Sequence, residues 1–152
     1  MFITDEDLDE LGSLLDKGRD EWIHGRLSWE TADSPITQPD DATIFGPFGG
    51  IAPAGVAPKV RPEVQRQLAA RFRGGSGSTD VIRTIVEGDL VIVVYVDRSM
   101  VQFDDLDHEH PWTLRVTEVF RRVPDGWARI HRHADPLTRF RDLVATRQLL
   151  AE

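Results

Sequence analysis

The sequence predicts an α+β fold in which helices pack on one face of an antiparallel sheet. Apolar residues recur at three- and four-residue steps over residues 4–24 and 62–73, which is typical of amphipathic helices. From residue 79 to about 135 the hydrophobic period changes to two, as expected for strands with two distinct faces. Short turns separate these strands, so we expect neighbouring strands to run antiparallel.

Three helices are expected. Thr4 is suited to cap the first, over residues 4–24, whose apolar stripe comprises Leu8, Leu11, Leu15, Gly18 and Trp22. Pro62 is suited to the first turn of the second, which we expect to end at Arg73 before Gly74 and Gly75. The third is expected over about 136–150, with an inner side made by Leu137, Phe140, Val144 and Leu150.

The strands are expected at about 79–87, 89–103, 112–123 and 127–135, with a short one near 42–45 and a linker at 75–78. Residues 90–96 read LVIVVYV and are apolar at every position. A strand with one wet face would alternate, so both faces of this strand must be covered. We expect a second copy of the chain to cover the outer face, which predicts a homodimer through that face of the sheet.

Length and composition exclude several classes of function. The 152 residues fit one domain, expected to span 1–152, and the formal net charge of −8 argues against nucleic-acid binding. The absence of cysteine excludes a thiol nucleophile or a cysteine zinc site. No apolar run approaches the ~20 residues of a membrane span, and the acidic amino terminus is unlike a signal peptide. We therefore expect a cytoplasmic protein without membrane contact.

The segment Thr113–Pro136 carries polar or ionisable side chains at alternate positions, which predicts a lined pocket or a polar interface. Arg115 and Thr117 share one strand face and are candidates for binding a ligand oxygen. The alternative is that they are internal partners of Asp97 or Glu118. No cofactor is expected: the glycine-rich segment 46–50 lacks the lysine of a phosphate-binding loop.

Asp97 is the candidate catalytic residue. It follows the apolar run 90–96 and shares a strand face with Tyr95. A carboxylate beside an apolar cavity has a raised pKa and can act as a general base near neutral pH. The alternative is a structural ion pair of Asp97 with Arg115 or Arg132. We expect Asp97 and Arg115 to lie close enough to interact, on neighbouring antiparallel strands that face the cavity.

His131 and His133 share one face of the last strand. They are either acid–base groups of a pocket or residues of the outer face at a dimer contact, and strand parity does not separate these alternatives. A structural role is favoured. We expect no metal site, because a third ligand would have to come from elsewhere.

The order of elements and the ending RVTEVFRR…DGW…IHRHADP resemble the nuclear transport factor 2-like superfamily. Within it, the chain is most similar to SnoaL-like branches that end in W-x-x-[IV]-H-x-H, here Trp127, Ile130, His131 and His133. The association domain of calcium/calmodulin-dependent kinase II shares this ending and the preceding arginine pair, here Arg121 and Arg122.

The resemblance implies a cone-shaped, curved sheet with three helices over its concave face, a deep pocket, and pairing through the convex face. It does not choose between enzymes and binding domains. We expect a pocket for a compact hydrophobic carbonyl or carboxylate compound; the alternative is a cofactor-independent isomerase, cyclase or dehydratase that uses Asp97. The residues expected to bind the ligand are Trp22, Phe45, Tyr95, Arg115, Thr117, Arg132, His131 and His133.

Overall fold

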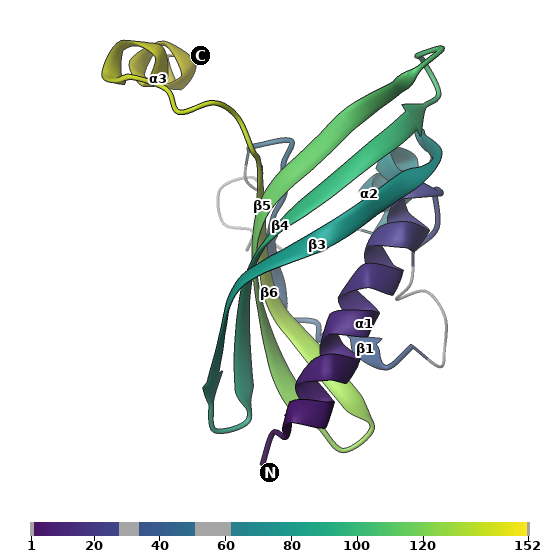
Figure 1. Ribbon diagram of the computed structural model, residues 1–152, viewed down its shortest axis with the longest axis vertical. Coiled ribbons are helices and arrows are strands. Elements are labelled where there is room, and N and C mark those ends of the chain that lie inside the picture. Colours follow the sequence, from purple (N-terminus) through teal and green to yellow (C-terminus); the bar gives the residue numbers. More distant parts are fainter. Residues whose placement is uncertain (1, 28–33, 51–61, 152) are drawn as a thin grey trace.

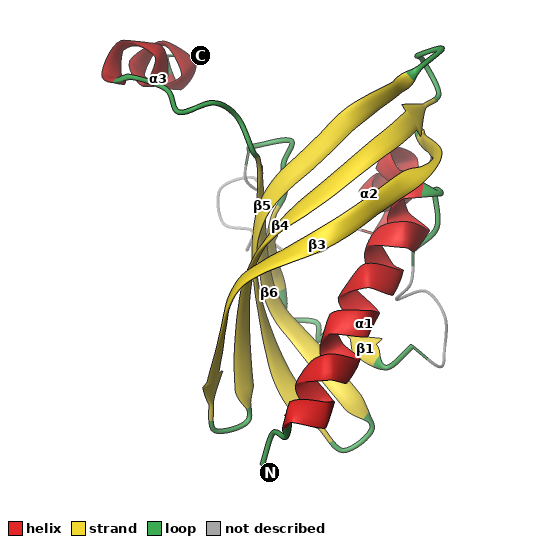
Figure 2. Cartoon of the chain, in the orientation of Figure 1, coloured by secondary structure: helices red, strands yellow, loops and turns green. Residues whose placement is uncertain are grey.

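The computed structural model describes residues 2–27, 34–50 and 62–151. In this part of the chain the elements are α1 (Asp5–Ile23), β1 (Ile36–Thr37), β2 (Thr43–Phe45), α2 (Pro62–Ala69), β3 (Phe72–Glu87), β4 (Leu90–Phe103), β5 (Glu109–Val123), β6 (Gly126–Pro136) and α3 (Leu143–Leu150). Figures 1 and 2 show a long, strongly curved sheet with α1 and α2 on its concave side. The predicted α+β class and curved sheet are confirmed.

The sheet has the order β1-β6-β5-β4-β3, and β2 also pairs with β6. β3, β4, β5 and β6 form an antiparallel meander, as the sequence predicted. β1 and β2 run parallel to β6, so the complete sheet is mixed. The short strands therefore extend the meander on the side of β6, and β3 forms the opposite edge.

α1 begins where the sequence predicts because Thr4 closes a capping box with Asp7. The Thr4 hydroxyl accepts a hydrogen bond from the Asp7 N–H at 3.1 Å, and the Asp7 carboxylate accepts one from the Thr4 N–H at 2.9 Å. Arg122 of β5 donates to Asp7 at 3.1 Å, so the start of the helix is also tied to the sheet. Leu11 and Ile23 are the buried residues of the helix face that contacts the sheet.

β4 has the predicted orientation. Val91, Val93, Tyr95 and Val101 are buried on the concave face, where they pack with α1 and β5. Residues of the opposite parity are half-buried on the convex face, namely Leu90, Ile92, Val94 and Val96. The apolar character of both faces therefore corresponds to an inner core and an outer apolar stripe.

Residues 75–78 form part of β3 and not the predicted linker, and α2 ends at Ala69 and not at Arg73. The physical reason is close backbone approach. Gly75 has φ +143°, and a Cβ at this position would collide with the carbonyl oxygen of Met100 on β4. The glycines that suggested a helix end and a linker instead allow the first part of β3 to lie against β4.

The last helix was predicted to begin at Pro136, but α3 begins at Leu143. The N–H of Leu137 donates to the carbonyl of Thr113 at 2.9 Å, which continues the pairing beyond β6, and Asp142 then caps α3 through the N–H of Ala145 at 2.8 Å. The expected inner residues are exposed: Leu137, Phe140, Val144 and Leu150. No residue of α3 is buried, and Figure 1 shows this helix apart from the sheet, so it does not cover the concave face.

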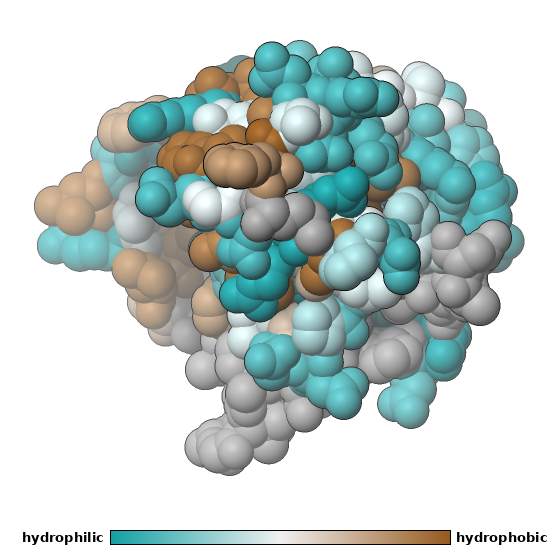
Figure 3. Space-filling model, turned by 90° about the horizontal axis from the view of Figure 1, so that it is seen from below, coloured by the Kyte–Doolittle hydropathy of each residue, from teal (hydrophilic) through white to brown (hydrophobic). Residues whose placement is uncertain are grey.

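Figure 3 shows the molecule from the end at which α1 begins. Hydrophobic side chains gather on one side of this view, and hydrophilic side chains cover most of the other side. Within the described residues, no helix has both the length and the apolar character needed to cross a membrane.

Candidate functional site

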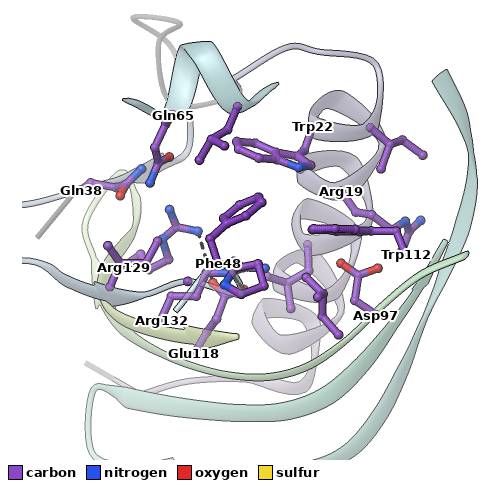
Figure 4. A pocket seen from close by; sticks show the side chains of 18 of the residues that line it. Arg19, Trp22, Gln38, Phe48, Gln65, Asp97, Trp112, Glu118, Arg129 and Arg132 are labelled. Atoms are coloured by element: carbon purple, nitrogen blue, oxygen red, sulfur yellow. Dashed lines mark hydrogen bonds and ion pairs between the residues drawn. The ribbon is translucent and has the colours of Figure 1, made fainter. Parts of the chain in front are cut away.

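The concave face of the sheet, α1, α2 and the segment 46–50 enclose a cavity of about 430 Å³. Its apolar walls include Leu14, Leu15, Trp22, Ile44, Phe48, Leu68, Trp112 and Leu114. Its polar groups are Arg19, Arg26, Gln38, Gln65, Tyr95, Asp97, Glu118, Arg129 and Arg132. Figure 4 shows the aromatic rings of Trp22, Phe48 and Trp112 around the centre, with the polar groups at the floor and the sides.

A β-bulge in β6 determines which of its side chains reach the cavity. Phe120 of β5 pairs with Arg129, but the preceding Val119 pairs with His131, so Ile130 is an extra residue in β6. The bulge reverses the alternation of side chains at this point. Arg129 and Arg132 therefore both line the cavity, although strict alternation would place residues of odd and even number on opposite faces.

The floor of the cavity is a buried cluster around Glu118, which is 2% exposed. The Tyr95 hydroxyl donates a hydrogen bond to Oε1 of Glu118, and the Nε of Arg132 lies 3.4 Å from the same oxygen. Nη1 of Arg129 lies 3.5 Å from Oε2. Burial and the Glu118 carboxylate raise the pKa of Tyr95, which keeps its hydroxyl protonated and able to donate. One buried carboxylate thus lies between two half-buried guanidinium groups.

Asp97 is 7% exposed, and burial raises its pKa to about 6, although Arg132 and Arg19 partly oppose this shift. Ser99 donates a long hydrogen bond to its carboxylate at 3.5 Å. Among the described residues, no basic side chain forms a salt bridge with Asp97. The Arg19 guanidinium instead contacts Asp16 at 2.9 Å and Asp20 at 3.2 Å. Asp97 is therefore a buried carboxyl group that titrates close to neutral pH.

Four of the residues singled out from the sequence line the cavity: Trp22, Tyr95, Asp97 and Arg132. They come from α1, β4 and β6, three elements that are far apart in the sequence. Tyr95 and Asp97 share the concave face of β4, as predicted. Arg132 contacts Glu118 and not Asp97, so the alternative, a direct ion pair between Asp97 and Arg132, is not formed.

The prediction that Arg115 and Thr117 face the cavity is wrong. In the register of β4 and β5, Asp97 pairs with Leu114, so Arg115 points to the opposite, convex face. There its guanidinium contacts Asp135 at 3.1 Å, and no pair with Asp97 forms. The inner face of β5 is the face of Leu114 and Glu118, because apolar residues of this parity build the core.

Phe45, His131 and His133 lie outside the cavity wall. The ring of Phe45 contacts the rings of both histidines, with centroid distances of 6.0 and 5.5 Å. Thr43 hydrogen-bonds His131 at 2.6 Å, and His133 contacts Asp135 at 3.1 Å. The histidines thus belong to the convex side of β6, which was one of the two alternatives. No cluster of three or more potential metal ligands occurs in the described ranges.

Four further cavity residues were not among the site residues predicted from the sequence: Glu118, Arg129, Gln38 and Gln65. A signal existed for Glu118, because it is a charged residue on the same parity as Leu114, Val116 and Phe120. Gln38 comes from a loop, where no period marks a cavity-facing position. Gln65 lies on α2 three residues before the cavity-lining Leu68, so the helical period did offer a signal for it.

We expect Glu118→Leu to destabilise the fold by up to about 3–5 kcal/mol, because it leaves two half-buried guanidinium groups without their buried carboxylate. Chemical denaturation at pH 7 measures the change. Glu109→Leu, at an exposed position of β5, is the matched control and should change stability by less than about 1 kcal/mol. Equal effects of the two substitutions would contradict a structural role of the Glu118 cluster.

Solved structures with the same fold are numerous. A nuclear transport factor 2-like superfamily protein from Salmonella enterica serovar Typhimurium has a TM-score of 0.62 and 13% identity, with 91% of this chain and 96% of that chain covered. A candidate dehydratase of the same family from Streptomyces avermitilis has a TM-score of 0.59 and 24% identity, with 88% and 98% covered.

The association domain of calcium/calmodulin-dependent kinase II from C. elegans is also similar, with a TM-score of 0.56, 16% identity, and 86% of this chain and 95% of that chain covered. No protein-family model matches the sequence, and a search of curated proteins found no match either. At these identities the likeness concerns the backbone arrangement. The chain therefore has the nuclear transport factor 2-like fold that its sequence resemblance implied.

Proposed function

We propose that the cavity binds a compact, largely hydrophobic molecule that carries a carbonyl or carboxylate oxygen. The observation that supports this most directly is the combination of aromatic walls with a few convergent polar groups. Trp22, Phe48 and Trp112 surround the centre of the cavity, and Asp97 and Arg132 lie at its edge (Figure 4). A molecule of this class would bury its apolar body among the rings and keep its oxygen hydrogen-bonded.

The charges around the cavity support an oxygen-bearing ligand. Arg132 contacts Glu118 through Nε, and a guanidinium group carries further N–H donors. These donors lie at the wall of the cavity. They favour a ligand whose oxygen has partial or full negative charge.

The test is a thermal-shift comparison of hydrophobic ketones and carboxylic acids, such as 2-acetonaphthone and 2-naphthoic acid, with nucleotides. We expect the aromatic compounds to raise the Tm, since a ligand that binds only the folded state stabilises it. Trp22→Ala should weaken the response by removing part of the apolar wall, whereas an exposed change, Phe140→Ala, should leave it intact. Stabilisation by nucleotides alone would contradict the proposal.

A second candidate is proton transfer by Asp97 in a cofactor-independent isomerase, cyclase or dehydratase. The observation that favours it is a buried carboxyl group with a pKa of about 6 beside a cavity large enough for a small substrate. In this mechanism the Asp97 carboxylate takes a proton from carbon next to a carbonyl group and returns it at another position. The structural neighbour from Streptomyces avermitilis is described as a candidate dehydratase.

The raised pKa of Asp97 predicts a pH dependence of stability. A carboxyl group with a higher pKa in the folded state stabilises the fold at low pH, and this contribution is lost as the pH rises through about 6. Asp97→Asn should therefore match the wild type near pH 4 and exceed its unfolding free energy by up to about 3 kcal/mol at pH 8. Urea denaturation across this range measures the difference. Asp125→Asn, in the exposed turn before β6, is the control.

We also propose a homodimer through the convex face of the sheet. The apolar stripe of β4 on this face, which includes Ile92 and Val94, is the surface that needs cover. The kinase association domain, whose name denotes assembly, has the same fold.

Val94→Glu should give monomers or aggregates in light scattering, because it places a charge inside the proposed interface. The matched change Val144→Glu, on the exposed α3, should leave the assembly state unchanged. A stable dimer of the Val94→Glu protein would show that this face is not the interface.

A further inference from the structure

Gln38 is a polar cavity residue whose side-chain amide forms no hydrogen bond within the described part of the chain. Both its Nε2 and its Oε1 are buried, and neither has a hydrogen-bond partner there. A buried amide without partners is destabilising, and such groups are rare in folded proteins. The residue lines the cavity, and Figure 4 shows it with Gln65 and Arg129 on the side opposite Asp97. The cavity therefore has a second polar end, which lies opposite Asp97.

The chemistry of a side-chain amide narrows the group that can satisfy it. Gln38 presents an N–H donor and a carbonyl acceptor side by side. A carboxylate has acceptors only, so it would pair with Nε2 and leave Oε1 without a donor. A ketone also offers only an acceptor, so it too would leave Oε1 of Gln38 without a donor. A carboxamide or a lactam offers one acceptor and one donor along one edge, and it can form two hydrogen bonds with Gln38 at once.

We propose that Gln38 determines ligand specificity and that the cavity takes a compact apolar molecule with a carboxamide or lactam edge directed toward this residue. The inference rests on the proposed function and narrows its carbonyl class to an amide carbonyl. The apolar body of such a molecule would lie among Trp22, Phe48 and Trp112, which surround the centre of the cavity.

Calorimetric titration with two probes of nearly equal shape, 2-naphthamide and 2-acetonaphthone, tests the proposal. They differ in a terminal NH₂ or CH₃ group, so the difference in affinity isolates the donor. We expect the wild type to bind the amide about tenfold more tightly than the ketone. The reason is that the amide forms two hydrogen bonds with the buried Gln38 amide, whereas the ketone forms one. Gln38→Met keeps the length of the side chain and should remove the preference, because it weakens the amide, which loses two hydrogen bonds, more than the ketone, which loses one.

Gln148→Met, on the exposed α3, is the matched control and should keep the full preference. The role of Gln38 would be overturned if the wild type bound the amide and the ketone with equal affinity, or if the preference for the amide survived in Gln38→Met. Binding of the ketone would in that case still support the proposed function. Failure of both probes to bind would overturn the proposed function and the inference with it. The Tm of each variant reports folding, and Gln38→Met should not lower it, because it removes an unpaired buried amide.

Discussion

The extra residue in β6 is the constraint on which the chemistry of the cavity depends. Without the bulge at Ile130, Arg129 and Arg132 would point to opposite faces of the sheet. With it, both guanidinium groups reach the concave side and flank Glu118, and His131 is turned to the convex side. A single bulge in the backbone of β6 thus places its two cavity arginines on the concave face of the sheet and its histidines on the convex face.

The charged side chains of the cavity depend on one another through their ionic contacts. Glu118 can remain buried because Tyr95, Arg129 and Arg132 surround its two oxygens. These partners are occupied by Glu118, and Arg19 is occupied by acidic residues of its own helix. Burial raises the pKa of Asp97 to about 6, and Arg132 and Arg19 oppose this shift only in part. The raised pKa therefore reflects burial that the neighbouring cations, which contact other carboxylates, do not fully offset.

Much of the fold could be predicted from the sequence, because hydrophobic period and capping are local signals. The start of α1 at Thr4 and the two faces of β4 are examples. The residues of the candidate site were harder to predict. On β5, the polar residues Arg115 and Thr117 were predicted to face the cavity, but they lie on the convex face. The alternate position Leu114 is apolar, and this identifies the inner face. On β6, no alternating pattern reveals a bulge, since its position depends on pairing with β5. Gln38 lies in a loop, where the cavity is formed by contacts distant in sequence.

The edge strand β3 has a consequence for behaviour at high concentration. An open edge of 16 residues exposes unpaired backbone groups that could recruit another strand. The pairing of β3 with β4 is interrupted between Phe72 and Gly75 and again between Val81 and Arg83, and charged residues such as Arg73 and Glu87 are exposed along it. Irregular, charged edges are poor templates for intermolecular strand addition. The same departures from regular geometry that allow the sheet to curve therefore guard this edge against aggregation.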